Sequence, residues 1–145
     1  MKVQLLTSDP QTWAVVFDEG DEVVEGLSRF AQQHEVDTAS LTAIGGFRSA
    51  TLAYFEVEAR EYRDIPVDEQ VEVLIMAGNI ARKDDGHQMH AHVVVGRPDG
   101  TTRGGHLKRA VVRPTLEVVV TETADHLRRR YDERTGLALI DLPPA

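Results

Sequence analysis

Only one segment of this chain carries a clear helical repeat, and strand-like runs fill most of the rest. A single apolar stripe recurs at helical spacing and consists of Val23, Val24, Leu27, Phe30 and Ala31. Asp21 is a suitable N-cap before this stripe, and Glu22 and Glu25 suit the positive end of a helix dipole. The pattern predicts one long helix, from about Glu22 to His34.

The remaining apolar runs are short, rich in β-branched or aromatic residues, and separated by turn residues. They predict strands over residues 12–17, 39–44, 49–57, 69–80, 89–96, 101–103, 111–112, 115–121 and 137–142. Pro98-Asp99-Gly100 indicates a hairpin turn, Glu61–Pro66 is expected to lead outward to a turn, and Ala124–Tyr131 to form a short helix. Because strands and helices do not alternate, the sequence predicts an α+β fold. We expect a large, mainly antiparallel sheet flanked by one long helix and one or more short ones.

The length of 145 residues favours a single domain over residues 1–145, with its core between about residues 12 and 142. The absence of cysteine excludes disulfides, thiolate zinc sites, iron–sulfur clusters and cysteine nucleophiles. No apolar run approaches the roughly 18 residues of a membrane span. The polar N-terminus also lacks the apolar core of a signal peptide. We therefore expect a cytoplasmic protein without membrane contact.

The net charge of −8 disfavours loose binding to nucleic acid, because contacts to phosphates require Lys and Arg. The charge is unevenly distributed along the chain. Residues 1–80 carry 5 basic and 15 acidic side chains, a net of −10, and residues 81–145 carry 11 and 9, a net of +2. A basic surface around Lys108, Arg109, Arg113 and Arg128–Arg130 would be open to DNA, although solvated charged faces explain the same residues. DNA is thus a partner that the composition allows but does not favour.

Three of the six histidines fall close together in the sequence. His90 and His92 are two residues apart on an expected strand, so their side chains point to the same face. The turn at Pro98–Gly100 returns the chain toward that strand and brings in His106 after two glycines. Three converging neutral imidazoles can hold Zn²⁺ or another first-row divalent metal. Such a site leaves a fourth position open for water or for a carboxylate or carbonyl oxygen of a ligand.

The alternative is that these three histidines hydrogen-bond to backbone groups at a subunit or strand interface. The other histidines lie outside the cluster on the expected elements: His34 ends the first helix, His87 lies in a loop, and His126 lies in the late helix.

A metal site is often joined by a carboxylate that acts as acid, base or ligand. Glu117, in an otherwise apolar strand, and Glu56, after Tyr54-Phe55, are the candidates for an acid–base role. The alternative is that both simply face water. Neither Gly45-Gly46 nor Gly104-Gly105 has the spaced glycine pattern before a helix that dinucleotide binding requires.

Several segments, in their order and spacing, resemble the plant and prokaryote conserved domain, also called the PPC or PCC domain. The resemblance covers nearly all of residues 13–142 and rests on Gly20-Asp21-Glu22-Val23, Ala43-Ile44-Gly45-Gly46-Phe47, Ala50-Thr51-Leu52-Ala53-Tyr54-Phe55, Gly78-Asn79-Ile80, His90-Ala91-His92, Asp99-Gly100, Gly104-Gly105-His106-Leu107 and Pro114-Thr115-Leu116-Glu117-Val118. The resemblance implies an α+β fold and a homotrimer. The implied fold is also similar to that of acetolactate decarboxylase, a zinc enzyme with a comparable three-histidine site, which is an analogy of fold alone.

This chain departs from the plant members of that family, in which the domain follows AT-hooks of nuclear DNA-binding proteins. The tripeptide Gly96-Arg97-Pro98 lies in a hairpin without basic flanks, so no AT-hook is present. His90, His92 and His106 resemble histidines of the prokaryotic members instead. We therefore expect a homotrimeric metal-binding protein, with zinc or another divalent ion and a small-molecule ligand or substrate at the metal. The alternatives are a DNA-associated regulatory protein and a pure assembly module with structural histidines.

Overall fold

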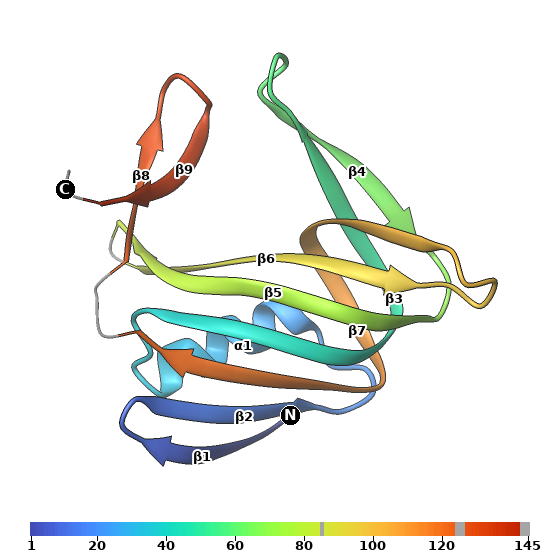
Figure 1. The fold of residues 1–145 in the computed structure, drawn as a ribbon, viewed down its shortest axis with the longest axis horizontal. Coiled ribbons are helices and arrows are strands. Elements are labelled where there is room, and N and C mark those ends of the chain that lie inside the picture. The colour runs from blue at the N-terminus through green and yellow to red at the C-terminus, as the bar shows by residue number, and fades with distance from the viewer. Residues whose placement is uncertain (85, 124–126, 143–145) are drawn as a thin grey trace.

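The computed structural model describes residues 1–84, 86–123 and 127–142, which form a 9-stranded sheet and one helix (Figure 1). The elements follow in the order β1 (Lys2–Ser8), β2 (Gln11–Phe17), α1 (Val23–Gln33), β3 (Ala39–Glu56), β4 (Glu61–Val67), β5 (Val71–Lys83), β6 (Gly86–Gly96), β7 (Thr102–Glu122), β8 (Arg128–Asp132) and β9 (Leu137–Asp141).

The sheet is almost wholly antiparallel, which confirms the predicted large, mainly antiparallel sheet. Its strands hydrogen-bond in the order β1-β2-β7-β3-β5-β8-β9, with β4 paired to β3 and β6 paired to both β5 and β7. Only the β5–β8 contact is parallel. Strand β7 pairs with β6 near its start and with β3 and β2 farther along, so that β3, β5, β6 and β7 close into a ring. The β3–β4 and β8–β9 hairpins extend beyond this ring at the same end of the molecule (Figure 1).

Helix α1 covers one face of the sheet and lies within the predicted range, but its 11 residues make it short rather than long. Its N-cap is Glu22 and not Asp21, because Glu22 Oε2 accepts a hydrogen bond from the Glu25 backbone N–H at 2.7 Å. The helix buries Val23, Gly26, Leu27, Phe30 and Ala31. No helix in the described part of the chain is long and apolar enough to cross a membrane.

The prediction of a second helix over Ala124–Tyr131 is wrong for the residues of this segment that the structure describes. Arg128–Asp132 is strand β8, and residues 124–126, with His126 among them, lie outside the described residues. Strand β8 pairs with β9 along its whole length, from Arg128 opposite Asp141 to Asp132 opposite Leu137. This pairing satisfies the backbone groups that a helix would have satisfied internally.

Other corrections concern strands that are longer than predicted. Strand β3 joins two predicted strands through Gly45-Gly46. Strand β7 joins three predicted strands and continues through Pro114. Gly45 has φ +147°, and a side chain there would collide with the β7 backbone at Thr115, so glycine permits this close pairing. Strand β4 replaces the predicted turn region over Glu61–Pro66, and β1 has no counterpart among the predicted strands. Both β1 and β4 are mostly exposed. Because neither strand has a largely buried face, their sequences lack the apolar alternation that predicts a strand.

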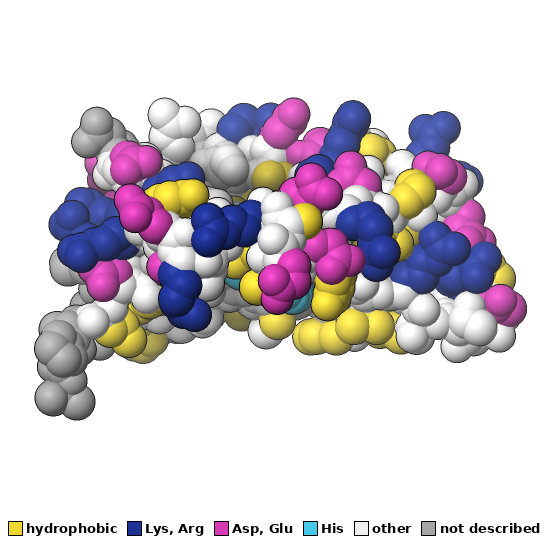
Figure 2. Space-filling model, turned by 90° about the horizontal axis from the view of Figure 1, so that it is seen from above, with side chains coloured by type: hydrophobic (Ala, Val, Ile, Leu, Met, Phe, Trp, Pro, Cys, Tyr) yellow, Lys and Arg dark blue, Asp and Glu magenta, His cyan; other side chains and the backbone are white. Residues whose placement is uncertain are grey.

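Alternating residues divide the sheet into a buried face under α1 and an open face. The buried face contributes core side chains that include Phe47, Met76, Val93, Leu116 and Val118. The open face carries four aliphatic side chains whose exposed fractions are 56% for Ile44, 44% for Ile75, 38% for Val94 and 45% for Val119. We call these four residues the open apolar face. Figure 2 shows hydrophobic side chains gathered along one long edge of the molecule.

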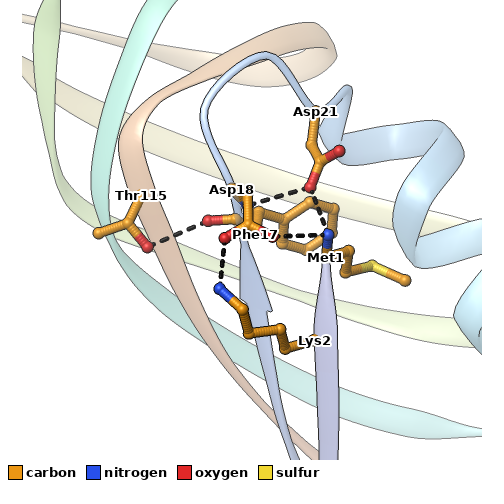
Figure 3. Close-up of polar contacts among 6 residues, drawn as sticks. All are labelled: Met1, Lys2, Phe17, Asp18, Asp21 and Thr115. Atoms are coloured by element: carbon orange, nitrogen blue, oxygen red, sulfur yellow. Dashed lines mark hydrogen bonds and ion pairs between the residues drawn. The ribbon is translucent and has the colours of Figure 1, made fainter.

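The start of the chain is fixed to the segment that leads into α1 (Figure 3). The Met1 ammonium lies 3.0 Å from Asp18 Oδ2 and 2.9 Å from Asp21 Oδ2, and Lys2 Nζ lies 2.6 Å from Asp18 Oδ1. Thr115 of β7 donates a hydrogen bond to the end of β2 at 3.0 Å. These contacts attach the β1–β2 edge to the rest of the sheet.

Gly78 of β5 allows the close approach of β6, the strand that carries His90 and His92. A Cβ atom at this position would collide with the backbone of His90 and would lie 2.7 Å from Ala91 Cα. We expect Gly78→Ala to lower the free energy of unfolding by about 1–3 kcal/mol, the usual cost of overpacking, in urea denaturation. Gly86→Ala is the control, because a Cβ at Gly86 meets open space. Equal unfolding midpoints for the two variants would contradict this expectation.

Candidate metal centre

His90, His92 and His106 lie together on the open face of the sheet. Strand β6 carries the first two on the face away from the core, since Ala91 between them is buried. The β6–β7 hairpin then places His106 opposite His92, which confirms the predicted return of the chain. The ring centroids are 5.1 Å apart for His90–His92, 5.0 Å for His90–His106 and 5.7 Å for His92–His106.

This cluster fits a divalent metal ion. One ligand nitrogen from each histidine lies within 4.8 Å of the other two. Tetrahedral Zn–N bonds of about 2.0–2.1 Å separate ligand nitrogens by roughly 3.3 Å, so modest ring rotations would bring the three onto one ion. His106 Nδ1 is buried and has no hydrogen-bond partner in the described part of the chain. All three residues belong to one chain, so the cluster forms without a second subunit.

The electrostatics of the cluster favour neutral imidazoles. Burial, followed by the charges of Arg129, His106 and His92, lowers the pKa of His90 from 6.5 to about 4. Burial also lowers the pKa of His106, and His92 and Lys108 lower it further. The neutral imidazole is the form that binds metal ions. His90 and His106 are therefore in the ligand form at neutral pH.

The cluster lies in the wall of a pocket of about 720 Å³ between the β3–β4 and β8–β9 hairpins. In Figure 2, which views this end of the molecule, histidine atoms are visible between surrounding acidic, basic and apolar side chains. The apolar and aromatic wall includes Tyr54, Phe55, Tyr62, Tyr131, Leu137 and Leu139. Lys83 and Arg129 are the cationic side chains of the lining, and no described residue of the lining is a carboxylate. The pocket can therefore enclose a small molecule beside the histidines.

Sequence reasoning missed the contribution of the two hairpins to this pocket. The Tyr62 ring lies 4.9 Å from the His106 ring, and Arg129, expected on a solvated helix, reaches His90. The available signal was the two-residue spacing of Arg129 and Tyr131. Both line the pocket, as residues on one face of a strand would.

The predicted carboxylates lie away from the pocket lining. Glu56 pairs with Arg63 at 3.7 Å, and Glu117 is exposed on the open face of the sheet. Neither contributes to the pocket or to the metal-ligand cluster, and their acid–base role stays a prediction. His34 follows the C-terminus of α1 as predicted, whereas His87 lies in β6 rather than in a loop.

The lowered pKa of His90 makes the metal-free protein sensitive to acid. Between pH 6.5 and about 4 the unfolded chain binds a proton at His90 that the folded chain does not bind. The neutral His90 therefore contributes its full share to the free energy of unfolding above pH 6.5. This contribution falls as the pH decreases through this window. In chelator-treated protein, the urea midpoint is expected to be lower at pH 5.5 than at pH 7. His90→Gln should show a smaller difference, and an equal pH dependence of the two proteins would refute the attribution to His90.

Comparisons with known proteins show which sequences and folds are similar to this chain. The sequence profile of the Plants and Prokaryotes Conserved (PCC) domain matches residues 7–124. Among curated proteins, the bifunctional protein GlmU of Synechococcus sp. (strain JA-3-3Ab) is 30% identical over 120 residues. This match covers 81% of the chain but only 18% of that protein, so the chain spans less than a fifth of the relative's length.

Solved structures of similar proteins share nearly the whole fold. The protein AF0104 from Archaeoglobus fulgidus, described as metal-containing, has a TM-score of 0.85 and 31% identity over 97% of each chain. A plant- and prokaryote-conserved (PPC) protein from Pyrococcus horikoshii has a TM-score of 0.86 and 28% identity, covering 99% of this chain and 97% of that one. A candidate DNA-binding protein from Bacteroides thetaiotaomicron has a TM-score of 0.86 and 28% identity, covering 90% and 91%.

Acetolactate decarboxylase from Bacillus subtilis strain 168 shares the fold alone. Its TM-score is 0.60 at 16% identity, over 90% of this chain and 60% of that one. The profile match, by contrast, extends over most of the chain and includes all three clustered histidines. The resemblance predicted from the sequence is confirmed, and this chain belongs to the Plants and Prokaryotes Conserved (PCC) domain family.

Proposed function

We propose that this chain is a metal-binding protein in which His90, His92 and His106 hold one divalent cation, with zinc as the first candidate. The convergence of their ligand nitrogens within 4.8 Å carries this proposal. Imidazole suits zinc and several other first-row metals, and three protein ligands leave one position open. The description of the related Archaeoglobus protein as metal-containing supports the same reading. A cytoplasmic location remains part of the proposal.

The open position would serve a small molecule, because the three histidines line the pocket. A bound divalent ion supplies a Lewis acid that polarises an oxygen of such a ligand. Glu56 and Glu117 remain the candidate acid–base groups. Neither residue lines the pocket of its own chain. Glu117 is exposed on the open face, so an acid–base role for Glu117 would require the pocket of a neighbouring subunit.

We further propose that the chain forms a homotrimer through the open apolar face. Its four aliphatic side chains are each more than a third exposed in the single chain. Exposed apolar side chains that gather on one face often mark interaction sites in soluble proteins. Subunit contacts would remove these side chains from water and could also cover exposed strand edges of the sheet.

Metal binding should raise the thermal stability of the protein. A ligand that binds only the folded state stabilises it, by about 2.7 kcal/mol at 100 times its Kd. We expect the Tm measured by calorimetry to rise when zinc is added and to fall again with EDTA. The Tm of His106→Ala should respond to neither. An identical Tm of the wild type in zinc and in EDTA would favour the alternative of an assembly module with structural histidines.

Association with DNA is the second candidate function, because the related Bacteroides protein is described as a candidate DNA-binding protein. In this chain much of the basic surface is neutralised by neighbouring carboxylates, through the pairs Lys108–Asp64, Arg113–Glu19 and Arg130–Asp141. Less positive charge is therefore left for phosphates. A mobility shift of duplex DNA that weakens steeply with salt would support this function. No shift at low salt would remove it.

A further inference from the structure

Arg129 lines the pocket but has no role in the proposed metal site. From β8 its Nη2 donates hydrogen bonds to Asn79 Oδ1 at 2.6 Å and to His90 Nδ1 at 3.2 Å, and Nη1 donates to the Ala138 carbonyl at 2.9 Å. Its Nε is buried without a partner, and no acidic side chain of the described residues pairs with this guanidinium. Partial burial lowers the pKa of Arg129 from its ordinary value. The pocket thus holds a partly desolvated positive charge that the described chain does not neutralise.

The hydrogen bond from Arg129 to His90 cannot coexist with a metal ion on His90. A guanidinium only donates, so His90 Nδ1 accepts and the neutral ring carries its proton on Nε2. A metal ion takes the lone pair of one ring nitrogen. If it takes Nδ1, no lone pair remains for Arg129. If it takes Nε2, the proton of the neutral ring moves to Nδ1, which becomes a donor. In both cases metal binding releases Arg129 Nη2 from His90.

The freed Nη2 N–H can bind a carboxylate, while the bonds to Asn79 and Ala138 still hold the guanidinium in the pocket. Nε and Nη2 lie along one edge of the planar group, and their parallel N–H bonds match the two oxygens of a carboxylate. Lys83 adds a second positive charge to the lining, which contains no described carboxylate that would repel an anion. The aromatic and aliphatic wall, with Phe55, Tyr62 and Leu139, suits an apolar body behind the carboxyl group.

We infer that the pocket binds a small organic monocarboxylate with an apolar or aromatic body, held by Arg129 beside the histidine cluster, and that its binding is coupled to the metal. The inference rests on the proposed metal site, since the cation frees the Arg129 donor. The coupling is reciprocal, because a carboxylate that holds Arg129 away from His90 also favours the cation. Arg129 would therefore be both a competitor of the metal in the empty pocket and a ligand-binding group in the loaded one.

Benzoate is a suitable probe because it combines a carboxylate with an aromatic ring. Calorimetric titrations of benzoate into zinc-loaded and chelator-treated wild-type protein test the coupling. We expect zinc to lower the Kd for benzoate at least about 10-fold, within the usual range of coupling between sites. Saturating benzoate should lower the Kd for zinc by the same factor. This reciprocal measurement uses the wild type and does not depend on the folding of any variant.

Arg129→Met removes the donors while keeping an apolar side chain of similar length. We expect this variant to bind benzoate at least about 10-fold more weakly in the zinc-loaded state, as loss of a charged anchor predicts. Its zinc affinity should equal or exceed that of the wild type, because the competing hydrogen bond is gone. Arg130→Met is the matched control, since Arg130 is exposed and pairs with Asp141 outside the pocket lining. It should leave both affinities unchanged.

The outcomes separate this inference from the proposed function. Absence of zinc binding by the wild type overturns both. Zinc binding combined with equal benzoate affinity in zinc-loaded and zinc-free protein overturns only the coupling to a carboxylate, and so does benzoate binding that survives Arg129→Met. Inorganic phosphate in the same titration tests the chemical class of the anion. Binding of phosphate in place of benzoate overturns the assignment to a carboxylate.

Discussion

Replacing His106 by alanine is expected to lower the zinc affinity of the protein by more than about 100-fold, since even outer partners of metal ligands are worth about 10–100-fold. The variant would retain only two protein ligands. The fold should persist, because the His106 side chain is only half-buried and Leu107 beside it provides the core packing of β7. Competition for zinc with a chromophoric chelator measures the affinity, and light scattering measures the assembly.

The control for this variant is His87→Ala. His87 lies on the same strand as His90 but outside the cluster, so its removal should leave the zinc affinity unchanged. Wild-type zinc affinity in His106→Ala would contradict the assignment of the ligands. Equal losses in both variants would indicate that zinc binds to surface histidines without a defined site.

Ile75→Asp is expected to convert the proposed homotrimer into folded monomers. Ile75 lies opposite Val94 in the β5–β6 pair, within the open apolar face, and is 44% exposed in the single chain. A closed trimer would bury three copies of the new carboxylate in apolar contacts, because each subunit repeats the same interface. An unpaired buried charge is far more costly than an exposed one. Light scattering at micromolar concentration should therefore change from three chain masses for the wild type to one for Ile75→Asp.

Val57→Asp provides the matched control for this effect. Val57 is also an exposed aliphatic residue, at 62%, but it follows the end of β3 and lies outside the open apolar face. This variant should remain a trimer. A trimeric Ile75→Asp would show that the open face is not the interface, and a monomeric wild type would contradict the proposed homotrimer.

The position of the histidine cluster could be predicted because it depends on local rules. The two-residue spacing of His90 and His92 places both on one face of any strand. The turn signal around Asp99 and Gly100 determines that the next strand returns alongside. His106 is therefore carried to the same place by hairpin geometry, without any information about distant parts of the chain. The sequence profile then confirms the family that the same segments resemble.

The rest of the pocket depends on distant pairings that leave little trace in the sequence. Arg129 belongs to a basic run without apolar alternation, and the pairing of β8 with β9 and β5 makes that run a strand. Tyr62 reaches the histidines because the exposed strand β4 folds back on β3. Hydrogen-bond partners such as Asn79 and Ala138 are brought to Arg129 by tertiary structure alone. Candidate ligands could thus be predicted, whereas the groups that surround them could not.

The metal content of the protein tests the central proposal most directly. Elemental mass spectrometry should be applied to untagged protein purified without a nickel column, so that no metal is introduced. We predict close to one zinc or other divalent ion per chain, held by His90, His92 and His106. Protein that holds no metal, even after zinc addition and dialysis, would contradict the metal site and return the three histidines to a structural role.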